Sequence, residues 1–187
     1  MSDQVWTPRP VDSDRRFEHL FSLHKDAVFA YFRRRLASPD DALDAAAEVF
    51  TVVWRRLDGV PDGMELPWIY GVCRRVLLNT RRSARRRENL ATKFSSMVAG
   101  HEEDPASEAL ARSELALVLA AVDLMSSTDR ELLRLVAWEQ LSPTELAVVL
   151  GCSAHAARQR LYRARRRLER RLGRSGQIED ETDESPR

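Results

Sequence analysis

Apolar residues recur at spacings of three and four along most of the chain, which is the pattern of amphipathic helices. In the first such stretch, Ser13 is the expected N-cap and the helix ends near Ser38. Pro39 suits the first position of the next helix, which is predicted over 39–57. The expected inward stripe of this second helix is Leu43, Ala46, Ala47, Phe50, Val53, Trp54 and Leu57. The chain thus opens with two helices that each have one apolar face.

A turn-prone stretch at 58–63 precedes a third helix, which is predicted to begin at Pro67. Its expected inner stripe is Ile69, Val72, Cys73, Val76, Leu77 and Thr80. Its other face is basic, because residues 74–87 contain seven arginines and no acid. A surface helix normally carries interleaved glutamates, so their absence favours polyanion binding over a merely solvated face. Trp68 and Tyr70 can stack on unpaired bases, although core packing explains Trp68 equally well.

The second half of the chain contains a more specific arrangement. One helix is predicted over 108–123, and another runs from a cap at Ser127 or Thr128 to Trp138. Both helices carry leucine and valine at helical spacing, so each has an apolar face to bury. These two helices are expected to support a motif that follows them.

That motif starts with a capping box, Ser142-Pro-Thr-Glu145, which predicts that a short helix begins after residue 142. Gly151 supplies a sharp turn after the short helix. Ser153 is the expected N-cap of a basic helix that extends to about Leu172. Two helices joined by a three-residue turn that contains glycine predict a helix-turn-helix, which places its second helix in the major groove of DNA.

The angular positions of residues on the last helix predict which face reads DNA. At 100° per residue, Ala157, Leu161, Ala164 and Leu168 cluster within one third of the circumference and should face the core. The opposite arc and its flanks comprise His155, Arg158, Gln159, Tyr162, Arg163 and Arg166. Glutamine pairs with adenine, arginine pairs with guanine, and tyrosine contacts a thymine methyl. The arginines at 165, 167, 170 and 171 are expected to contact phosphates.

Composition and charge extend this pattern to the whole chain. Of its 187 residues, 43% are hydrophobic and 32% are charged. The net charge is only +1, because basic segments at 13–95 and 108–174 are offset by acidic segments at 96–107 and 175–187. We therefore expect an all-α protein with two small helical domains, 13–95 and 108–174. A flexible acidic linker at 96–107 joins them, and disordered tails flank them at 1–12 and 175–187. The acidic tail can also mask the arginines of its own chain.

Other features argue against other classes of protein. No apolar run approaches the ~18 residues of a membrane span, and the amino end lacks the pattern of a secretory signal, so we expect a cytoplasmic protein without membrane insertion. Cys73 and Cys152 lie far apart and lack a CxxC partner, so they are expected to pack as small apolar side chains. His101-Glu102-Glu103-Asp104 is better explained as solvated linker than as a metal site. No motif for catalysis or for a cofactor is found, so neither is expected.

Three segments resemble the extracytoplasmic-function (ECF) group of bacterial RNA polymerase sigma factors. They are 41–54, 67–79 and 141–166, and their order and spacing are more specific than any one of them. The resemblance covers about residues 14–172. It implies a transcription initiation factor that binds core RNA polymerase and directs it to specific promoters, with no enzymatic activity. Ala156, Ala157 and His155 depart from the usual pattern, so a relative's promoter sequence does not transfer.

The resemblance also implies a role for each segment. The stretch matching 41–57 docks on the beta-prime clamp helices of the polymerase, and the beta subunit is a further contact. The residues assigned to polymerase binding are Asp41, Asp44, Glu48, Val49, Val52 and Arg56. The stretch matching 58–82 opens the minus-10 element and holds a flipped base; the residues are Trp68, Tyr70, Arg74, Arg75, Asn79, Arg81 and Arg82. The last two helices bind the minus-35 duplex through the arc described above. Short members of the family are commonly silenced by an anti-sigma factor.

A stand-alone helix-turn-helix regulator is the alternative interpretation. It explains residues 142–172, but it leaves the stripe at 41–57 and the basic helix at 67–87 without a role. Such a regulator should bind DNA unaided, whereas an initiation factor acts on the polymerase. The two hypotheses therefore differ in whether DNA recognition requires a second protein.

Overall fold

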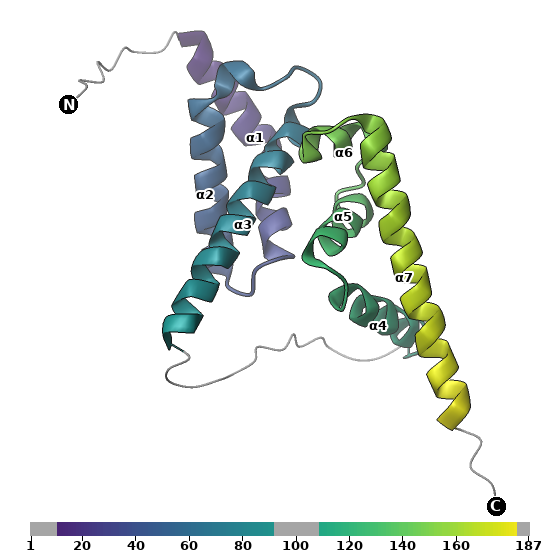
Figure 1. Ribbon diagram of the computed structural model, residues 1–187. Coiled ribbons are helices and arrows are strands. Elements are labelled where there is room, and N and C mark those ends of the chain that lie inside the picture. Colours follow the sequence, from purple (N-terminus) through teal and green to yellow (C-terminus); the bar gives the residue numbers. More distant parts are fainter. Residues whose placement is uncertain (1–10, 92–108, 183–187) are drawn as a thin grey trace, which may run out of the picture. The chain divides into compact units, whose positions relative to one another are not determined.

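The computed structural model describes residues 11–91 and 109–182, and every regular element within these ranges is a helix (Figure 1). The chain divides into two compact units, Met1–Ala99 and Gly100–Arg187. The all-α fold class is therefore confirmed. The predicted linker at 96–107, with its His101–Asp104 cluster, lies outside the described residues.

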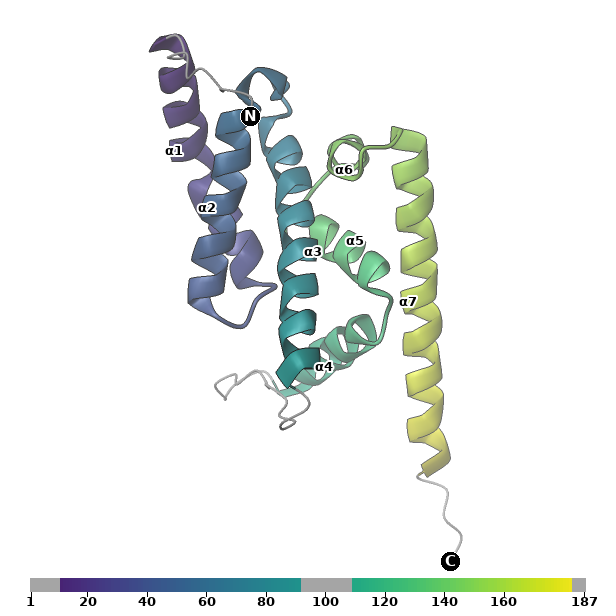
Figure 2. The same ribbon diagram turned by 60° about the vertical axis from the view of Figure 1, so that its left-hand side comes forward.

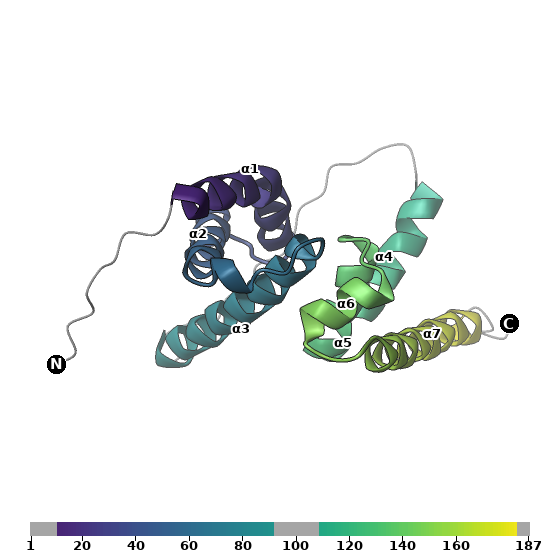
Figure 3. The same cartoon turned by 90° about the horizontal axis from the view of Figure 1, so that it is seen from above.

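The first unit consists of three α-helices and one short 3-10 helix. The elements are α1 (Val11–Arg33), α2 (Pro39–Arg55), η1 (Leu57–Gly59) and α3 (Glu65–Ala91). Each of the three long helices packs against the other two, as Figures 2 and 3 show. Ser38 caps α2 by accepting a hydrogen bond from the backbone N–H of Asp41 at 3.2 Å, and Pro39 takes the first helical position as predicted.

Two predicted helix starts in the first unit are wrong. The helix α1 begins at Val11, so Ser13 lies inside its first turn together with two aspartates, which the helix dipole favours there. The helix α3 begins at Glu65 rather than at Pro67. Proline is tolerated in a first turn, because the N–H that it lacks would have no partner within the helix.

The predicted stripe of α2 is confirmed at Phe50 and Val53 but is rotated from the observed one in the first turns of the helix. Its buried residues are Ala42, Ala45, Val49, Phe50 and Val53. Leu43, which we expected inside, is 55% exposed, and Ala47 is exposed as well. Small alanines at 42 and 45 let α2 approach its neighbours closely, so the larger Leu43 is left toward solvent. The predicted stripe of α3 is confirmed, since Ile69, Val72, Cys73, Val76 and Leu77 are all buried.

The second unit consists of four helices. They are α4 (Ala109–Asp123), α5 (Ser127–Ala137), α6 (Pro143–Leu150) and α7 (Ala154–Thr182), and α7 packs along the other three (Figure 1). The cap of α5 is Ser126, whose hydroxyl accepts from the backbone N–H of Asp129 at 3.1 Å, so the predicted caps Ser127 and Thr128 are wrong. The helix α7 passes the predicted end near Leu172, because Gly173 weakens a helix without ending it.

The turn between α6 and α7 has the predicted geometry. The Ser142 hydroxyl accepts from the N–H of Glu145 at 3.3 Å, and the Glu145 carboxylate accepts from the N–H of Ser142 at 2.8 Å. Gly151 ends α6 in the left-handed region, with φ 60° and ψ 43°, where a side chain would be strained. Ser153 then accepts from the N–H of Ala156 at 3.2 Å and starts α7. Local capping chemistry therefore fixes the start of the recognition helix.

The core of the second unit lies beneath α7. Ala157 and Ala164 are fully buried and Leu161 is 7% exposed, as predicted for the inner face of this helix. Leu135 of α5 and Leu146 of α6 are fully buried opposite them. Because alanine is small, α7 lies close to its neighbours, and its long side chains remain on the outer face.

Candidate nucleic-acid interface

The outer face of α7 presents the predicted reading residues together. All six are exposed: His155, Arg158, Gln159, Tyr162, Arg163 and Arg166. Tyr162 is 62% exposed, an unusual degree for an aromatic ring in a packed unit. The capped turn that precedes α7 orients this face, since the helix begins at Ala154 directly after Ser153. The structure therefore gathers on one helix face the set that the angular argument predicted.

These side chains form a ladder of weak contacts along the helix. The Nε2 atoms of Gln159 and His155 lie 3.2 Å apart, and an Nη2 group of Arg163 donates to Oε1 of Gln159 at 3.3 Å. The Arg166 guanidinium lies 5.9 Å from the ring centroid of Tyr162. Exposed pairs of this kind contribute little to stability, so the same groups can exchange them for base edges.

Arg166 has a second neighbour on its own helix. Its Nη1 group donates to the Glu169 carboxylate at 3.3 Å. The hydrogen bond that Arg166 donates to Glu169 raises the pKa of Arg166 most, followed by the one that it donates to the Tyr162 hydroxyl. Arg166 therefore keeps its charge, and Glu169 occupies part of its hydrogen-bonding capacity.

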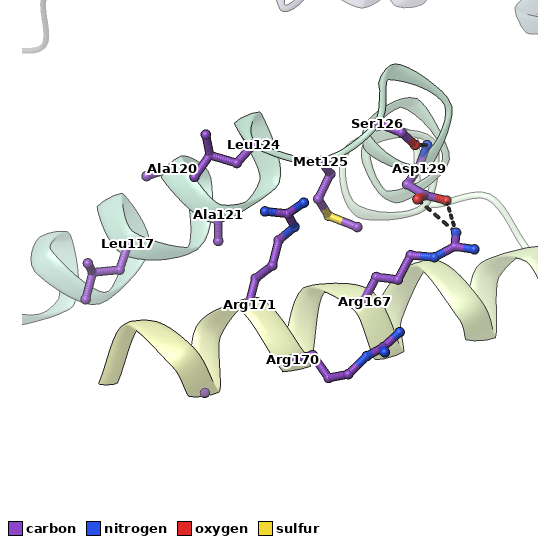
Figure 4. Close-up of a pocket in the computed structure, with 11 residues that line it drawn as sticks. Leu117, Ala120, Ala121, Leu124, Met125, Ser126, Asp129, Arg167, Arg170 and Arg171 are labelled. Atoms are coloured by element: carbon purple, nitrogen blue, oxygen red, sulfur yellow. Dashed lines mark hydrogen bonds and ion pairs between the residues drawn. The ribbon is translucent and has the colours of Figure 1, made fainter. Parts of the chain in front are cut away.

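Arg167 has a different role from the phosphate contact that we expected. Its Nη1 group donates to both carboxylate oxygens of Asp129, at 2.8 and 2.9 Å, as Figure 4 shows. The Asp129 side chain is 14% exposed, and its backbone N–H is bonded to the cap of α5. Arg167 therefore ties α7 to the start of α5 and holds the recognition helix in place.

In the first unit, most of the residues assigned to polymerase binding lie at the surface of α2. Asp41, Asp44, Glu48 and Arg56 are exposed, and Val52 is half-buried. Val49 is fully buried, so its assignment to a polymerase-binding surface is wrong. Position 49 lies on the inward stripe of α2 because that stripe is rotated from the predicted one.

A groove of about 320 Å³ lies between α2 and α3. It is lined by Glu48, Val52, Arg55, Arg56, Val72, Arg75, Val76 and Asn79. Residues that we assigned to polymerase binding thus face residues that we assigned to the minus-10 element. Periodicity gives the face of each helix but not the register between two helices, so no signal in the sequence could have paired the two sets.

Tyr70 does not occupy the position that we expected. It is 4% exposed, and its ring centroid lies 5.7 Å from that of Tyr31 in α1. Its assignment as a base-stacking residue is therefore wrong, because the ring is buried in the core. Trp68 is half-buried at the start of α3 and keeps an accessible surface.

The polar residues predicted along α3 lie partly within the fold. Asn79 and Arg82 are exposed, whereas Arg74 is half-buried. Arg75 is exposed, and its Nε group donates to the Gly71 carbonyl at 3.1 Å. Arg81 is half-buried, and its Nη2 group donates to the Arg35 carbonyl at 3.4 Å. The basic face of α3 is therefore present, but two of its arginines, Arg75 and Arg81, donate hydrogen bonds to backbone carbonyls of the same unit.

Arg35 is a residue that the sequence analysis missed. It is 8% exposed, and its guanidinium lies 3.6 Å from the ring centroid of Tyr31. Its Nη1 group donates to the Tyr31 carbonyl at 2.9 Å. Among the three arginines at 33–35, Arg35 follows Tyr31 by four residues, so helical spacing places it on the inner face, and it was missed because arginine is rarely buried. The backbone carbonyl of Arg35 in turn accepts the hydrogen bond from Arg81 described above.

No group of three or more metal-ligating side chains occurs within 11–91 and 109–182. Cys73 is buried and Cys152 is half-buried, and neither forms a disulfide bond. No helix among the described residues is long and apolar enough to cross a membrane.

Together, the fold and the interface define a two-module helical protein with a helix-turn-helix, and comparison with known proteins places it further. A model of sigma-70 region 2 matches residues 20–87, and a model of sigma-70 region 4 matches 115–168. The chain is 30% identical over 156 residues to the RNA polymerase sigma-E factor of Streptomyces avermitilis, covering 83% of this chain and 84% of that protein. It is 30% identical over 177 residues to the sigma factor CnrH of Cupriavidus metallidurans, covering 89% and 92%.

A solved structure agrees in fold. The sigma factor RpoE of Bartonella quintana, in complex with the anti-sigma factor NepR, matches with a TM-score of 0.59 and 23% identity, over 84% of this chain and 96% of that one. The chain belongs to the bacterial RNA polymerase sigma factors, in their extracytoplasmic-function group. It is a transcription initiation factor and not an enzyme.

Proposed function

We propose that this sigma factor reads the minus-35 element as duplex with α6 and α7, and opens the minus-10 element with its first unit. The observation that carries the proposal is the exposure of six polar and aromatic residues on one face of α7, directly after a capped turn. A helix presented in this way fits the major groove, where each base pair offers a distinct set of donors and acceptors. The second unit is accordingly the part that chooses the promoter.

Within the reading face, the first turns of α7 carry the sequence-reading contacts. Arg158 suits bidentate binding to guanine, and Gln159 suits adenine. Tyr162 offers an exposed ring to a thymine methyl. The flanking Arg163 and Arg166 lie on the same face. Arginines further along α7 set the register on the phosphates and do not read sequence.

The first unit supports the polymerase-binding and melting roles. We infer that the exposed acids of α2, Asp41, Asp44 and Glu48, together with Arg56, face the beta-prime clamp helices. Val52 faces the groove between α2 and α3, where Arg75 and Asn79 also lie. Polymerase bound along α2 would therefore hold α3 beside the unpaired DNA strand. Trp68, Arg74 and Arg82 complete the surface that we assign to the minus-10 element.

Binding alone supplies the energy in this scheme. Basic residues of both units replace counterions on DNA, which favours association and makes it dependent on salt. Capture of unpaired bases by the first unit then makes melting favourable, because each stacked base contributes about 1–3 kcal/mol. No nucleotide hydrolysis is needed for this step. The protein acts where the polymerase and the chromosome are, in the cytoplasm.

An anti-sigma factor is a further partner that we propose. The structures of RpoE and of CnrH that resemble this chain were solved with NepR and with the cytosolic domain of CnrY, respectively. A regulator of this kind would mask surfaces that otherwise meet the polymerase. Co-purification of the intact chain from its own cells would identify the regulator.

Binding to short duplexes tests the reading face. We expect Arg158→Ala and Gln159→Ala each to weaken binding of polymerase holoenzyme to its minus-35 sequence by about 1–3 kcal/mol. Arg160→Ala is the matched control, because Arg160 is exposed on α7 but lies outside the reading arc. That control should weaken binding uniformly across sequences. Unchanged minus-35 footprints for both test variants would contradict the assignment of the face.

A stand-alone regulator remains the competing function, and the same assay separates it. Such a protein would protect a specific DNA site without the polymerase. We expect the isolated chain to show weak protection that falls steeply with salt, and specific protection with core polymerase present. Specific protection by the chain alone, with no change when polymerase is added, would favour the regulator.

A further inference from the structure

A second groove lies on the face of the second unit between α4 and α7 (Figure 4). Its volume is about 840 Å³. Its apolar lining comes from Leu117, Ala120, Ala121, Leu124 and Met125. Its opposite wall on α7 is cationic at Arg170 and Arg171, whereas Arg167 is paired with Asp129, which also lines the groove. The groove therefore fits a segment with an apolar side chain flanked by acids.

The apolar wall of the groove is left toward solvent by the packing of the unit. Leu124 is 71% exposed and Leu117 is 42% exposed. Covering an apolar side chain contributes roughly 25 cal/mol for each Å² removed from water. An exposed wall of this kind beside Arg170 and Arg171 has both a hydrophobic and an electrostatic reason to bind a partner.

The carboxyl-terminal part of the same chain has the matching chemistry. Ile178 is followed directly by Glu179, Asp180 and Glu181, and two further acids occur at 183 and 184. No other stretch of the sequence after the helix-turn-helix is acidic, and Gly173, which lines the end of the groove, lies only five residues before Ile178. Five residues span up to about 17 Å, so the segment can turn back and reach the groove.

The helical extension of α7 that carries this segment is intrinsically weak. It contains Gly173 and Gly176, which disfavour a helix, and it ends at Thr182 with three acids in its last turns. Negative charge at a helix carboxyl end is opposed by the helix dipole. Both effects lower the cost of breaking the helix near Gly173, where a turn would redirect the chain.

We propose that residues 177–184 dock into the groove between α4 and α7, in exchange with the extended form of α7. Ile178 then covers the leucine wall, and Glu179, Asp180 and Glu181 face Arg170 and Arg171. A docked segment competes with any other protein for this groove and reduces the positive potential of α7. This docking is a property of the chain itself and does not depend on the promoter-reading role.

Paramagnetic broadening in the full-length chain tests the proposal. A nitroxide is attached at Glu184→Cys in a Cys152→Ser background, and the methionine methyl groups carry the isotope label. In the extended form, the last helical residue, Thr182, lies about 22 Å along the axis from the level of Arg167, whereas docking brings the segment near Met125. We expect the Met125 methyl signal to be broadened at low salt and to recover at high salt, and the Met64 signal in the first unit serves as the reference.

Two sets of variants keep the test decisive. Gly173→Ala favours the helix, and nothing lies within 4 Å of its added Cβ, so we expect the docked-to-extended ratio to fall about two- to five-fold. Arg170→Glu with Arg171→Glu should abolish the broadening, whereas Arg160→Glu, an exposed charge reversal outside the groove, should not.

Three outcomes would overturn the proposal. The first is an unbroadened Met125 signal at low salt. The second is broadening that is unchanged by Gly173→Ala and by the paired arginine reversal. The third is broadening in a mixture where nitroxide and isotope are on different molecules, which would assign the groove to a second copy of the chain. Loss of promoter recognition would leave all three readouts unaffected, so the two proposals fail separately.

Discussion

The two units of this sigma factor bury different kinds of side chain beneath their functional helices. In the first unit, Tyr31, Phe32 and Ile69 are fully buried, and the groove between α2 and α3 is lined largely by charged and polar residues. In the second unit, α7 contributes the alanines at 157 and 164 to the core, and its neighbour α4 leaves leucines exposed. The first unit thus buries aromatic side chains between its three long helices, whereas α7 packs through alanines onto Leu135 and Leu146 and displays its outer face.

The largest expected effect on stability comes from truncating a large buried side chain of the first unit. Phe32→Ala leaves a cavity in the first unit, and we expect it to lower the free energy of unfolding of that unit by about 3–5 kcal/mol. Phe21→Ala is the matched control, because Phe21 is 41% exposed and should cost less. Denaturant unfolding of the full chain measures both changes. Equal losses for the two variants would mean that burial does not distinguish the two positions.

In the second unit, the opposite change, a larger side chain in the core beneath α7, should be destabilising. Ala157 is fully buried under α7, so Ala157→Leu should cost about 1–3 kcal/mol of that unit's stability and also displace the reading face. The same substitution at the exposed Ala137 should change stability by less than about 0.5 kcal/mol. Unfolding and duplex binding are measured together. An unaltered Ala157→Leu protein would show that α7 does not lie close to its neighbours.

Helix capping gives a further test of the comparison, because the helix-turn-helix of the second unit begins with the Ser142 cap of α6. Ser142→Ala removes the hydroxyl that bonds the N–H of Glu145, so we expect a loss of about 0.5–2 kcal/mol. Ser142→Asp should restore most of it. Thr144→Ala, at an exposed position in the same turn, is the control. A loss confined to the control would refute the role of the cap.

The two units should also differ in their response to acid. Burial lowers the pKa of His24 in α1, whose Nε2 atom has no hydrogen-bond partner, although Glu65 opposes the shift. A lowered histidine pKa means that the unfolded state binds more protons, so the first unit loses stability as pH falls from 6.5 through the lower folded value. In the second unit, the hydrogen bond from Ser142 lowers the pKa of Glu145, so the corresponding loss begins only near pH 4.5.

Stability measured between pH 7 and pH 4 for each unit checks this difference. His24→Gln should flatten the decline of the first unit, whereas the same change at the exposed His19 should leave the decline in place. A second unit that weakens at higher pH than the first would contradict the assignment.

The parts of the fold that sequence predicted best are those fixed by local chemistry. The capping box at Ser142, the left-handed Gly151 and the inner alanines of α7 follow from residue type and spacing within one or two turns. Because the reading face is the complement of that inner face, its six exposed residues could be found without a structure. The ends of α1, α3 and α7 were harder, since an acid-rich first turn, a proline and a glycine each permit more than one boundary.

The parts that could not be predicted depend on contacts between helices. Val49 was assigned to polymerase binding by resemblance and Tyr70 to base stacking by residue type, but packing against neighbouring helices buries both. Likewise, the charge of Arg167 suggests a phosphate contact, and Asp129, distant in sequence, takes that charge instead. Arg35 is a different case, because its cation–π partner Tyr31 is only four residues earlier; the spacing was available, and the residue was missed because arginine is rarely buried. Spacing predicts a helix face, whereas register between helices decides which residues on it stay accessible.

Initiation from a promoter library by core RNA polymerase with the purified full-length chain tests the central claim most directly. We expect transcripts from a restricted set of promoters that share one minus-35 sequence, and we expect Arg158→Ala with Gln159→Ala to relax that choice. Association of the chain with the polymerase without any selection of start sites would contradict the account. So would selective occupancy of the same DNA by the chain with no polymerase present.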